Sequence, residues 1–286
     1  MTAPSSRVAR AFVRNPVAVL GLVLLAATGT IAAFAPVVAP DSYDDQDVRA
    51  RLKPPLSRSP AGRVYALGTD PLGRDVWSRI VYGARVTMSV AATALVLGGG
   101  IGVGLGLVAG FAGRWADALI MRAADIQLAF PSLLLAIGLV AALGTNLVTL
   151  LGVLALRSWA IHARTVRGSV LLVREQESVL AARALGAGPL RLAFKEILPN
   201  VLAPLIVVST AQLGALILLE STLSFLGLGI QPPRPSWGNM LSAGRPYMTV
   251  AWWVATMPGL AILAAVLGAN LLGDGLRDAL DPRLKV

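Results

Sequence analysis

The chain has 286 residues, of which 25 are basic and 15 acidic, so charged residues make up 14% of it, against about 25% in soluble domains. Hydrophobic residues make up 56% and the mean hydropathy is +0.71, which is more apolar surface than one core of this size can hide from water. The chain has no cysteine and one histidine, which excludes disulfides, thiolate metal sites and a cysteine nucleophile, and argues against a cofactor or metal on this chain.

Long uncharged runs indicate membrane-spanning helices, because about 20 apolar residues cross the roughly 30 Å hydrocarbon core. The chain has five such runs, at 15–40, 86–113, 126–156, 197–219 and 246–273. The first run is too long for a signal peptide and is predicted to remain as the first span. Basic residues fall mostly between the runs, so the net charge of +10 indicates loops that flank spans and not a nucleic-acid surface.

The polar segment between the first two runs contains the sequence LGTDPLGRD at 67–75. Asp70 before Pro71 is a good start for a helix, and Gly73 offers a tight turn. We therefore expect a capped turn that leads into a helix at the membrane surface over 76–82. The second run then contains a glycine-rich stretch at 98–106, which predicts a span packed closely against a neighbour, since small residues let helices approach in lipid.

The third run has 31 residues and would form a helix of about 46 Å, which is too long for one ordinary span. We expect a break at 144–146, with one span over 126–143 and the next from Leu147 past Arg157 to about Ala163. The prediction is therefore six spans.

Two charges fall within these spans, where exposure to lipid is costly. Arg157 is predicted to face protein or a water-filled cavity, either as a structural pair or snorkelling group or as part of a transport pathway. Glu220, at the outer end of the fifth span, is expected to be a structural acceptor, with a role in a pathway as the alternative. The single histidine, His162, is expected to be a polar residue at the inner boundary.

The loop between the fourth and fifth spans reads SVLAARALGAGP at 178–189, followed by LRLAFKEILPN at 190–200. Two short helices are predicted. The first ends at Gly186 or Gly188, and the second has Pro189 in its first turn. A helix–glycine–helix unit with a face of alanines is small enough to enter a groove on another protein.

The distribution of lysine and arginine predicts that both termini are cytoplasmic. With the N-terminus inside, the inner segments hold fourteen basic residues, whereas the two short outer loops hold only Arg234 and Arg245. The first outer segment, about 41–85, is long enough to be translocated to the outer side of the membrane with little influence from its charges. We divide the chain into residues 1–63, with the tail, the first span and the start of the outer segment, and a core over 64–286 with five further spans.

The loop between the fourth and fifth spans resembles the E-A-A-x-x-x-G…L-P coupling loop of ATP-binding cassette importer permeases. The matching positions are Ala181, Ala182, Gly186, Leu198 and Pro199, and the glutamate position of the pattern holds Leu180. In that family the loop docks into a cytoplasmic ATPase subunit. The resemblance therefore implies that these residues, with the intervening Arg183, form the contact that couples this chain to an ATPase.

Other segments resemble the OppC/DppC type of dipeptide and oligopeptide permease over nearly the whole chain. They are NPVAVLGL at 15–22, FAP at 34–36, LGTDPLGRD at 67–75, YGAR at 82–85, LSFLGLG at 223–229, PSWG at 235–238 and NLLGDGLRDALDPR at 270–283. The resemblance implies an all-α, six-span membrane subunit with the type I importer permease fold. It also implies four kinds of partner: a homologous permease of the OppB/DppB type, two cassette ATPases that bind ATP and Mg²⁺, an extracytoplasmic binding protein, and membrane lipid.

The resemblance gives some outer residues an alternative role. Asp70, Gly73, Arg74 and Asp75 would form an outer gate or a contact for the binding protein, and so would Trp237, which could instead be an anchor at the membrane interface.

The function expected is therefore that of a non-enzymatic, multi-pass subunit of the cytoplasmic (inner) membrane that carries dipeptides or oligopeptides. The spans offer no converging set of nucleophiles, and no phosphate-binding Gly-x-x-x-x-Gly-Lys-Ser/Thr motif occurs, so ATP hydrolysis is assigned to other chains. The alternatives are an ion-coupled secondary transporter, which should show midplane carboxylates and paired repeats, or an importer of the same type that carries nickel or oligosaccharides.

Overall fold

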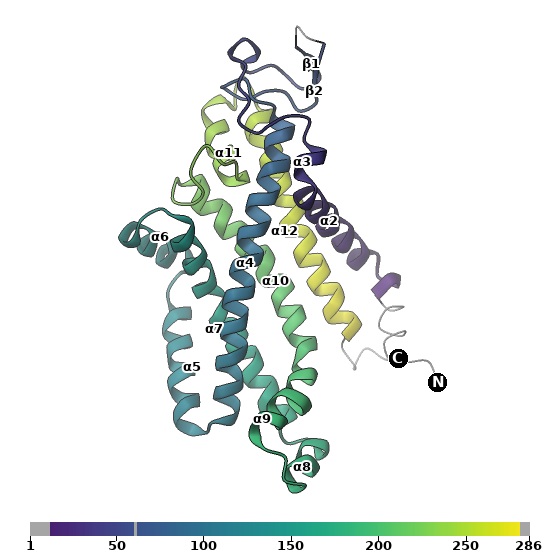
Figure 1. The fold of residues 1–286 in the computed structure, drawn as a ribbon, viewed down its shortest axis with the longest axis vertical. Coiled ribbons are helices and arrows are strands. Elements are labelled where there is room, and N and C mark those ends of the chain that lie inside the picture. The colour runs from purple at the N-terminus through teal and green to yellow at the C-terminus, as the bar shows by residue number, and fades with distance from the viewer. Residues whose placement is uncertain (1–11, 60–61, 281–286) are drawn as a thin grey trace.

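The computed structural model describes residues 12–59 and 62–280, which form a bundle of long helices with a small extended segment at one end (Figure 1). The terminal stretches of the predicted topology, 1–11 and 281–286, lie outside the described residues. The elements are α2 (Pro16–Ala33), α3 (Ala35–Val38), a 3₁₀ turn (Val48–Ala50), β1 (Ser57–Arg58), β2 (Val64–Tyr65), α4 (Val76–Phe111), α5 (Arg114–Ala129), α6 (Ser132–Leu143), α7 (Leu147–Val173), α8 (Glu177–Ala184), α9 (Pro189–Arg191), a π-helical stretch (Leu192–Ile197), α10 (Leu198–Phe225), α11 (Trp237–Gly244), a second 3₁₀ turn (Arg245–Tyr247) and α12 (Trp253–Leu280).

The predicted all-α membrane class is confirmed. Within residues 12–59 and 62–280, five helical segments are long and apolar enough to cross a membrane: α2, α4, α7, the continuous segment Pro189–Phe225, and α12. The bent pair α5 and α6 makes a sixth span if its two parts are counted together. The predicted break at 144–146 is also confirmed, since α6 ends at Leu143 and the side chain of Asn146 caps α7 by accepting from the backbone N–H of Thr149 at 2.8 Å.

The single span expected over 126–143 is wrong. The chain instead bends by 92° between α5 and α6, at Phe130 and Pro131. Proline has no backbone N–H and disfavours helical geometry in the residue before it, so a helix that reaches Phe130 stops there. α5 also begins twelve residues before the predicted start, at Arg114, because its acidic side chains are paired: Asp117 with Arg167, at 2.6 Å, and Asp125 with Arg164.

The glycine-rich stretch packs α4 against α7, as predicted. Gly98, Gly102, Gly106 and Gly110 recur at every fourth position and lie on the face of α4 that contacts α7. A Cβ at Gly98, Gly102 or Gly106 would strike a backbone carbonyl oxygen of α7. The two helices therefore approach backbone to backbone, which is the packing that small residues permit in lipid.

The first span, α2, also packs closely against the last one, α12, through glycines. A Cβ at Gly21 on α2 would meet the backbone of Leu271 and Leu272, and one at Gly275 on α12 would meet Ala18. The main apolar core lies between α4, α7, α10 and the helices beside them, and includes the fully buried Leu154, Leu216 and Leu223. These contacts hold the spans in one bundle.

The outer segment forms an ordered cap at the end of the bundle where β1 pairs with β2 (Figure 1). The expected surface helix at 76–82 is wrong, because these residues are the first two turns of the 36-residue helix α4. The helix starts at Val76 and is capped by Asp75 and not by Asp70, since the Asp75 carboxylate accepts from the backbone N–H of Ser78 at 2.7 Å.

Candidate functional site

The loop between α7 and α10 lies at the opposite end of the molecule from the β1–β2 hairpin (Figure 1). Its first helix, α8, ends as predicted: Gly186 has a φ of +82° and follows the last turn, while the backbone N–H of Ala187 donates to the Ala182 carbonyl at 3.0 Å. This left-handed residue is the usual glycine position beyond a helix end, because a Cβ is disfavoured there. Pro189 then opens the second helix, also as predicted.

α8 is held to the bundle by one buried side chain. Val179 is 1% exposed and packs in a cluster with Val173, Leu192 and Ile197, which come from α7 and from the start of the second helix. Ala182 of the same helix packs against this cluster and is half-buried. The loop is therefore fixed in place against α7 and α10, while most of its surface is left free.

That free surface carries four large exposed apolar side chains among exposed charged ones, Arg183, Arg191 and Lys195. Leu180 is 43% exposed, Leu185 89%, Leu190 74% and Phe194 58%. We call these four residues the loop patch. Ala181, Arg183 and Gly186 are exposed beside it, whereas Ala182 is half-buried. Leu180 and Leu185 lie outside the candidate spans, so their exposed apolar side chains indicate a surface that another protein covers.

Leu198 and Pro199, the last two residues of the predicted loop motif, do not lie on this patch. They form the first turn of α10, where Leu198 is half-buried against the cluster around Val179 and Pro199 is exposed. They therefore lie within the continuous helical segment Pro189–Phe225, about ten residues from its start.

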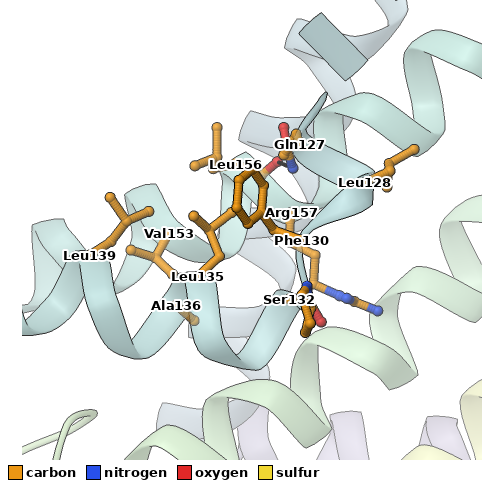
Figure 2. Close-up of a pocket in the computed structure, with 11 residues that line it drawn as sticks. Gln127, Leu128, Phe130, Ser132, Leu135, Ala136, Leu139, Val153, Leu156 and Arg157 are labelled. Atoms are coloured by element: carbon orange, nitrogen blue, oxygen red, sulfur yellow. Dashed lines mark hydrogen bonds between the residues drawn. The ribbon is translucent and has the colours of Figure 1, made fainter. Parts of the chain in front are cut away.

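Arg157 lines a cavity of about 290 Å³ at the bend between α5 and α6. Figure 2 shows that the walls are mostly apolar and come from both sides of the bend and from α7. Phe130, Leu135 and Leu156 are among them, together with the polar side chains of Gln127 and Ser132. Arg157 makes no ion pair with another described residue, and its buried Nε has no hydrogen-bond partner there.

Glu220 is fully buried near the C-terminal end of α10. Its carboxylate accepts hydrogen bonds from the hydroxyls of Ser224, at 2.7 Å, and of Ser221, at 3.4 Å. Ser224 in turn accepts from the backbone N–H of Ile230 at 3.0 Å, which ties α10 to the loop that follows it. These contacts place Glu220 in a structural polar cluster and away from the Arg157 cavity.

The outer turn is a buried structural unit. Asp70 is 4% exposed, accepts from the backbone N–H groups of Leu72 and Arg74, and pairs with the side chain of Arg74 at 2.6 Å. A Cβ at Gly73, whose φ is +74°, would strike the backbone of Asp47. The capped turn is therefore present as predicted, and the carboxylates of Asp70 and Asp75 are both buried.

Trp237 is neither an interfacial anchor nor an exposed contact. It is 1% exposed, its indole Nε1–H donates to the Ile80 carbonyl at 3.0 Å, and its ring lies against Gly83 on α4. Trp252, which is 51% exposed, has the exposure expected of an interfacial residue. The two tryptophans have different roles that the sequence alone does not separate.

The expectation for His162 is also wrong, because it is fully buried inside the bundle. Its Nδ1 lies 2.8 Å from the Ser158 carbonyl oxygen and its Nε2 lies 3.1 Å from Ser209 Oγ on α10. The ring packs over Gly99, where a side chain would meet it. The glycine-rich stretch opposite is the one feature of the sequence that could have indicated room for a buried ring.

Comparison with known proteins covers both ends of the chain. Residues 102–286 match the model of the family described as binding-protein-dependent transport system inner membrane component, and residues 4–55 match the N-terminal TM domain of oligopeptide transport permease C. The chain is 45% identical to the dipeptide transport system permease protein DppC of Alkalihalophilus pseudofirmus over 272 residues, which are 95% of this chain and 88% of that protein.

Two further relatives also match this chain over almost its whole length. The di/tripeptide transport system permease protein DppC of Pseudomonas aeruginosa is 45% identical over 276 residues, or 96% of this chain and 91% of the relative. The dipeptide transport system permease protein DppC of Haemophilus influenzae is 42% identical over 274 residues, or 96% and 93%.

Proposed function

This chain belongs to the family of binding-protein-dependent transport system inner membrane components, and from that membership we propose that it is the permease subunit of an ATP-driven importer of dipeptides or oligopeptides. The substrate class is supported by the relatives, which are named as dipeptide or di/tripeptide permeases. This chain matches them over almost their whole length. The chain itself forms half of the translocation pathway and performs no chemistry.

The observation that carries the proposal is the loop patch on and beside α8. Leu180 and Leu185 of this patch lie outside the candidate spans, where exposed apolar side chains indicate a protein partner, and the loop is fixed to α7 and α10 through Val179 and Leu192. We assign that partner as a cassette ATPase, so that ATP and Mg²⁺ bind on the partner. A movement of the ATPase would then reach the spans directly, because the second loop helix continues into α10.

The remaining partners follow from the family. A homologous permease would complete the pathway, a second ATPase would bind to it, and an extracytoplasmic binding protein would deliver the substrate at the β1–β2 end. The topology we propose places both termini in the cytoplasm. It is supported by the basic residues of the inner segments and by α2 starting and α12 ending toward the α8 side of the bundle (Figure 1).

The proposal is tested by reconstitution of the purified permease pair with its ATPases and binding protein in liposomes. Uptake of a radiolabelled dipeptide should require ATP and the binding protein, and should stop when the ATPases are left out. Uptake that follows a proton or sodium gradient without the ATPases would contradict it. The substrate class is tested by mass spectrometry of the ligand that copurifies with the binding protein, where a nickel ion or an oligosaccharide would contradict the assignment to peptides.

A further inference from the structure

The Arg157 cavity contains polar groups that have no partner within the described part of the chain. The side-chain atoms Arg157 Nε and Gln127 Oε1 are both buried there without a hydrogen-bond partner, although Gln127 Nε2 donates to the carbonyl of Leu156. Buried polar atoms are paired in nearly all native structures. Two unpaired atoms on one cavity therefore indicate a site that is completed by a polar group from outside this chain.

The charge of Arg157 is unlike the other charges on its helix. Arg164 and Arg167, farther along α7, pair with Asp125 and Asp117 of α5. Beyond Asp125 the chain turns away at Pro131, so α5 offers no third carboxylate at the level of Arg157. The bend thus removes the acidic partner from one arginine and opens the cavity in the same place.

Arg157 lies inside a helix that is long and apolar enough to cross a membrane, away from both of its ends. Arg157 lies ten residues, or about 15 Å, from the start of α7, and seven residues, or about 10 Å, from Arg164 in the other direction. These distances place Arg157 in the interior of a span that crosses a hydrocarbon core of roughly 30 Å, nearer to Arg164 than to the start of the helix. An anion that reaches this depth is therefore carried by a molecule in the pathway or by another protein chain.

The walls of the cavity define the ligand further. A cavity of about 290 Å³ is just below the range of about 300–1,000 Å³ that is usual for drug-sized ligands, so it accommodates one residue and not a whole oligopeptide. Arg157 offers N–H donors with a positive charge, Gln127 offers an amide oxygen, and Leu135, Leu139 and Val153 offer an apolar wall. The last residue of a peptide has the complementary groups: a carboxylate, a backbone N–H and a side chain.

Resting on the proposed peptide transport, we propose that this cavity is a subsite in the membrane for the C-terminal residue of the peptide, with Arg157 binding its carboxylate. The 57% exposure of Phe130 leaves one wall open toward the space outside the chain, where the second permease would complete the pathway. A guanidinium pairs with a carboxylate through two parallel N–H···O bonds. The subsite lowers the barrier that the apolar spans impose on a charged chain end.

The charge of the cavity can be measured directly, because the chain has no cysteine of its own. In the reconstituted complex, Ser132→Cys places a thiol on the cavity wall, and two methanethiosulfonates of similar size, one with a sulfonate and one with a trimethylammonium group, compete for it. We expect the anionic reagent to react about tenfold faster or more, and saturating dipeptide to slow it. In Ser132→Cys/Arg157→Gln this preference should be lost, whereas the control Ser132→Cys/Arg164→Gln should keep it.

Transport supplies the second measurement, in the natural background. At saturating binding protein and dipeptide, Arg157→Gln should reduce maximal uptake about tenfold or more, and Arg157→Lys should restore part of it. Wild-type uptake by Arg157→Gln, or a cavity thiol with no anionic preference and no protection by peptide, would overturn the subsite. If a carboxylate of the partner permease pairs with Arg157 instead, the cavity thiol shows no preference for the anionic reagent. Arg157→Gln then reduces assembly of the two permeases. Failure of the wild-type complex to take up any peptide would overturn the proposed function and is seen before a variant is made.

Discussion

His162 on α7 and Ser209 on α10 are joined by a hydrogen bond, with 3.1 Å between Nε2 and Oγ, inside the part of the bundle that crosses the membrane. The imidazole fits there because Gly99 and Gly102 of α4 present no side chain to it. Three spans that are far apart in the chain therefore meet at one residue. Their packing there depends on the glycines of one helix and on the single histidine of another.

The glycine face of α4 can be tested with two substitutions on the same helix. Gly102→Leu should destabilise the protein by about 1–3 kcal/mol, because the new side chain would strike the Trp159 carbonyl and His162. Gly104→Leu is the control, since nothing lies within 4 Å of a Cβ at that position. Thermal unfolding of the purified, detergent-solubilised complex measures the difference. Equal midpoints for the two variants would contradict close packing of α4 on α7.

The turn after α8 is the second feature open to a direct test. Gly186→Trp adds a bulky side chain at a φ of +82° beside the loop patch, so it should leave the spans inserted but abolish substrate-stimulated ATP hydrolysis and uptake. Gly188→Ala should keep both activities, because Gly188 has a φ of −68° and open space around it. Normal assembly and transport by Gly186→Trp would show that the loop does not dock onto the ATPase.

Leu180 stands at the position where the family pattern has glutamate, which indicates an apolar contact with the ATPase. Leu180→Asp should weaken binding of the ATPase about tenfold to a hundredfold, the loss expected from one buried leucine, whereas Leu180→Met should bind as the wild type does. Titration of purified ATPase onto the permease pair in nanodiscs measures both affinities. Tighter binding by the aspartate variant would indicate that the partner offers a basic pocket instead.

The proposed orientation predicts which thiols an impermeant reagent reaches. In intact cells from which any outer membrane has been removed, Arg58→Cys on β1 should be labelled, and Ser178→Cys on α8 only after the cells are opened. Both side chains are exposed, so accessibility within the fold does not limit either reaction. The reverse pattern would place α8 outside and exclude its contact with a cytoplasmic ATPase.

Local signals in the sequence predicted the elements that depend only on near neighbours. The break at 144–146 and the turn at Gly186 are set by glycine and by helix caps within a few residues, and both are found where expected. Pro131 also acts locally, but it stands inside a long uncharged run. The length of that run favours one span, so it does not indicate the bend between α5 and α6.

The burial of single polar and aromatic residues could not be predicted in the same way. Trp237 and His162 are buried because Gly83, Gly99 and Gly102 of α4 happen to lie opposite them, across 60 to 154 residues of chain. Asp70 and Asp75 look equally suited to start a helix, and their contacts with Arg74 and Ser78 decide between them. Which helices become neighbours is a property of the whole bundle, and no local pattern gives it.

The helical segment Pro189–Phe225 has a mechanical consequence that follows from the place of Ser209 near its middle. Its 37 residues span about 56 Å, so a tilt of about 5° around the bond to His162 would move each end by about 2 Å in opposite directions. The π-helical stretch Leu192–Ile197 and Pro204 both lie on the inner arm of this lever, and both interrupt regular hydrogen bonding. A movement at α8 would therefore reach the part of the helix beyond Ser209 through a stretch that can itself bend.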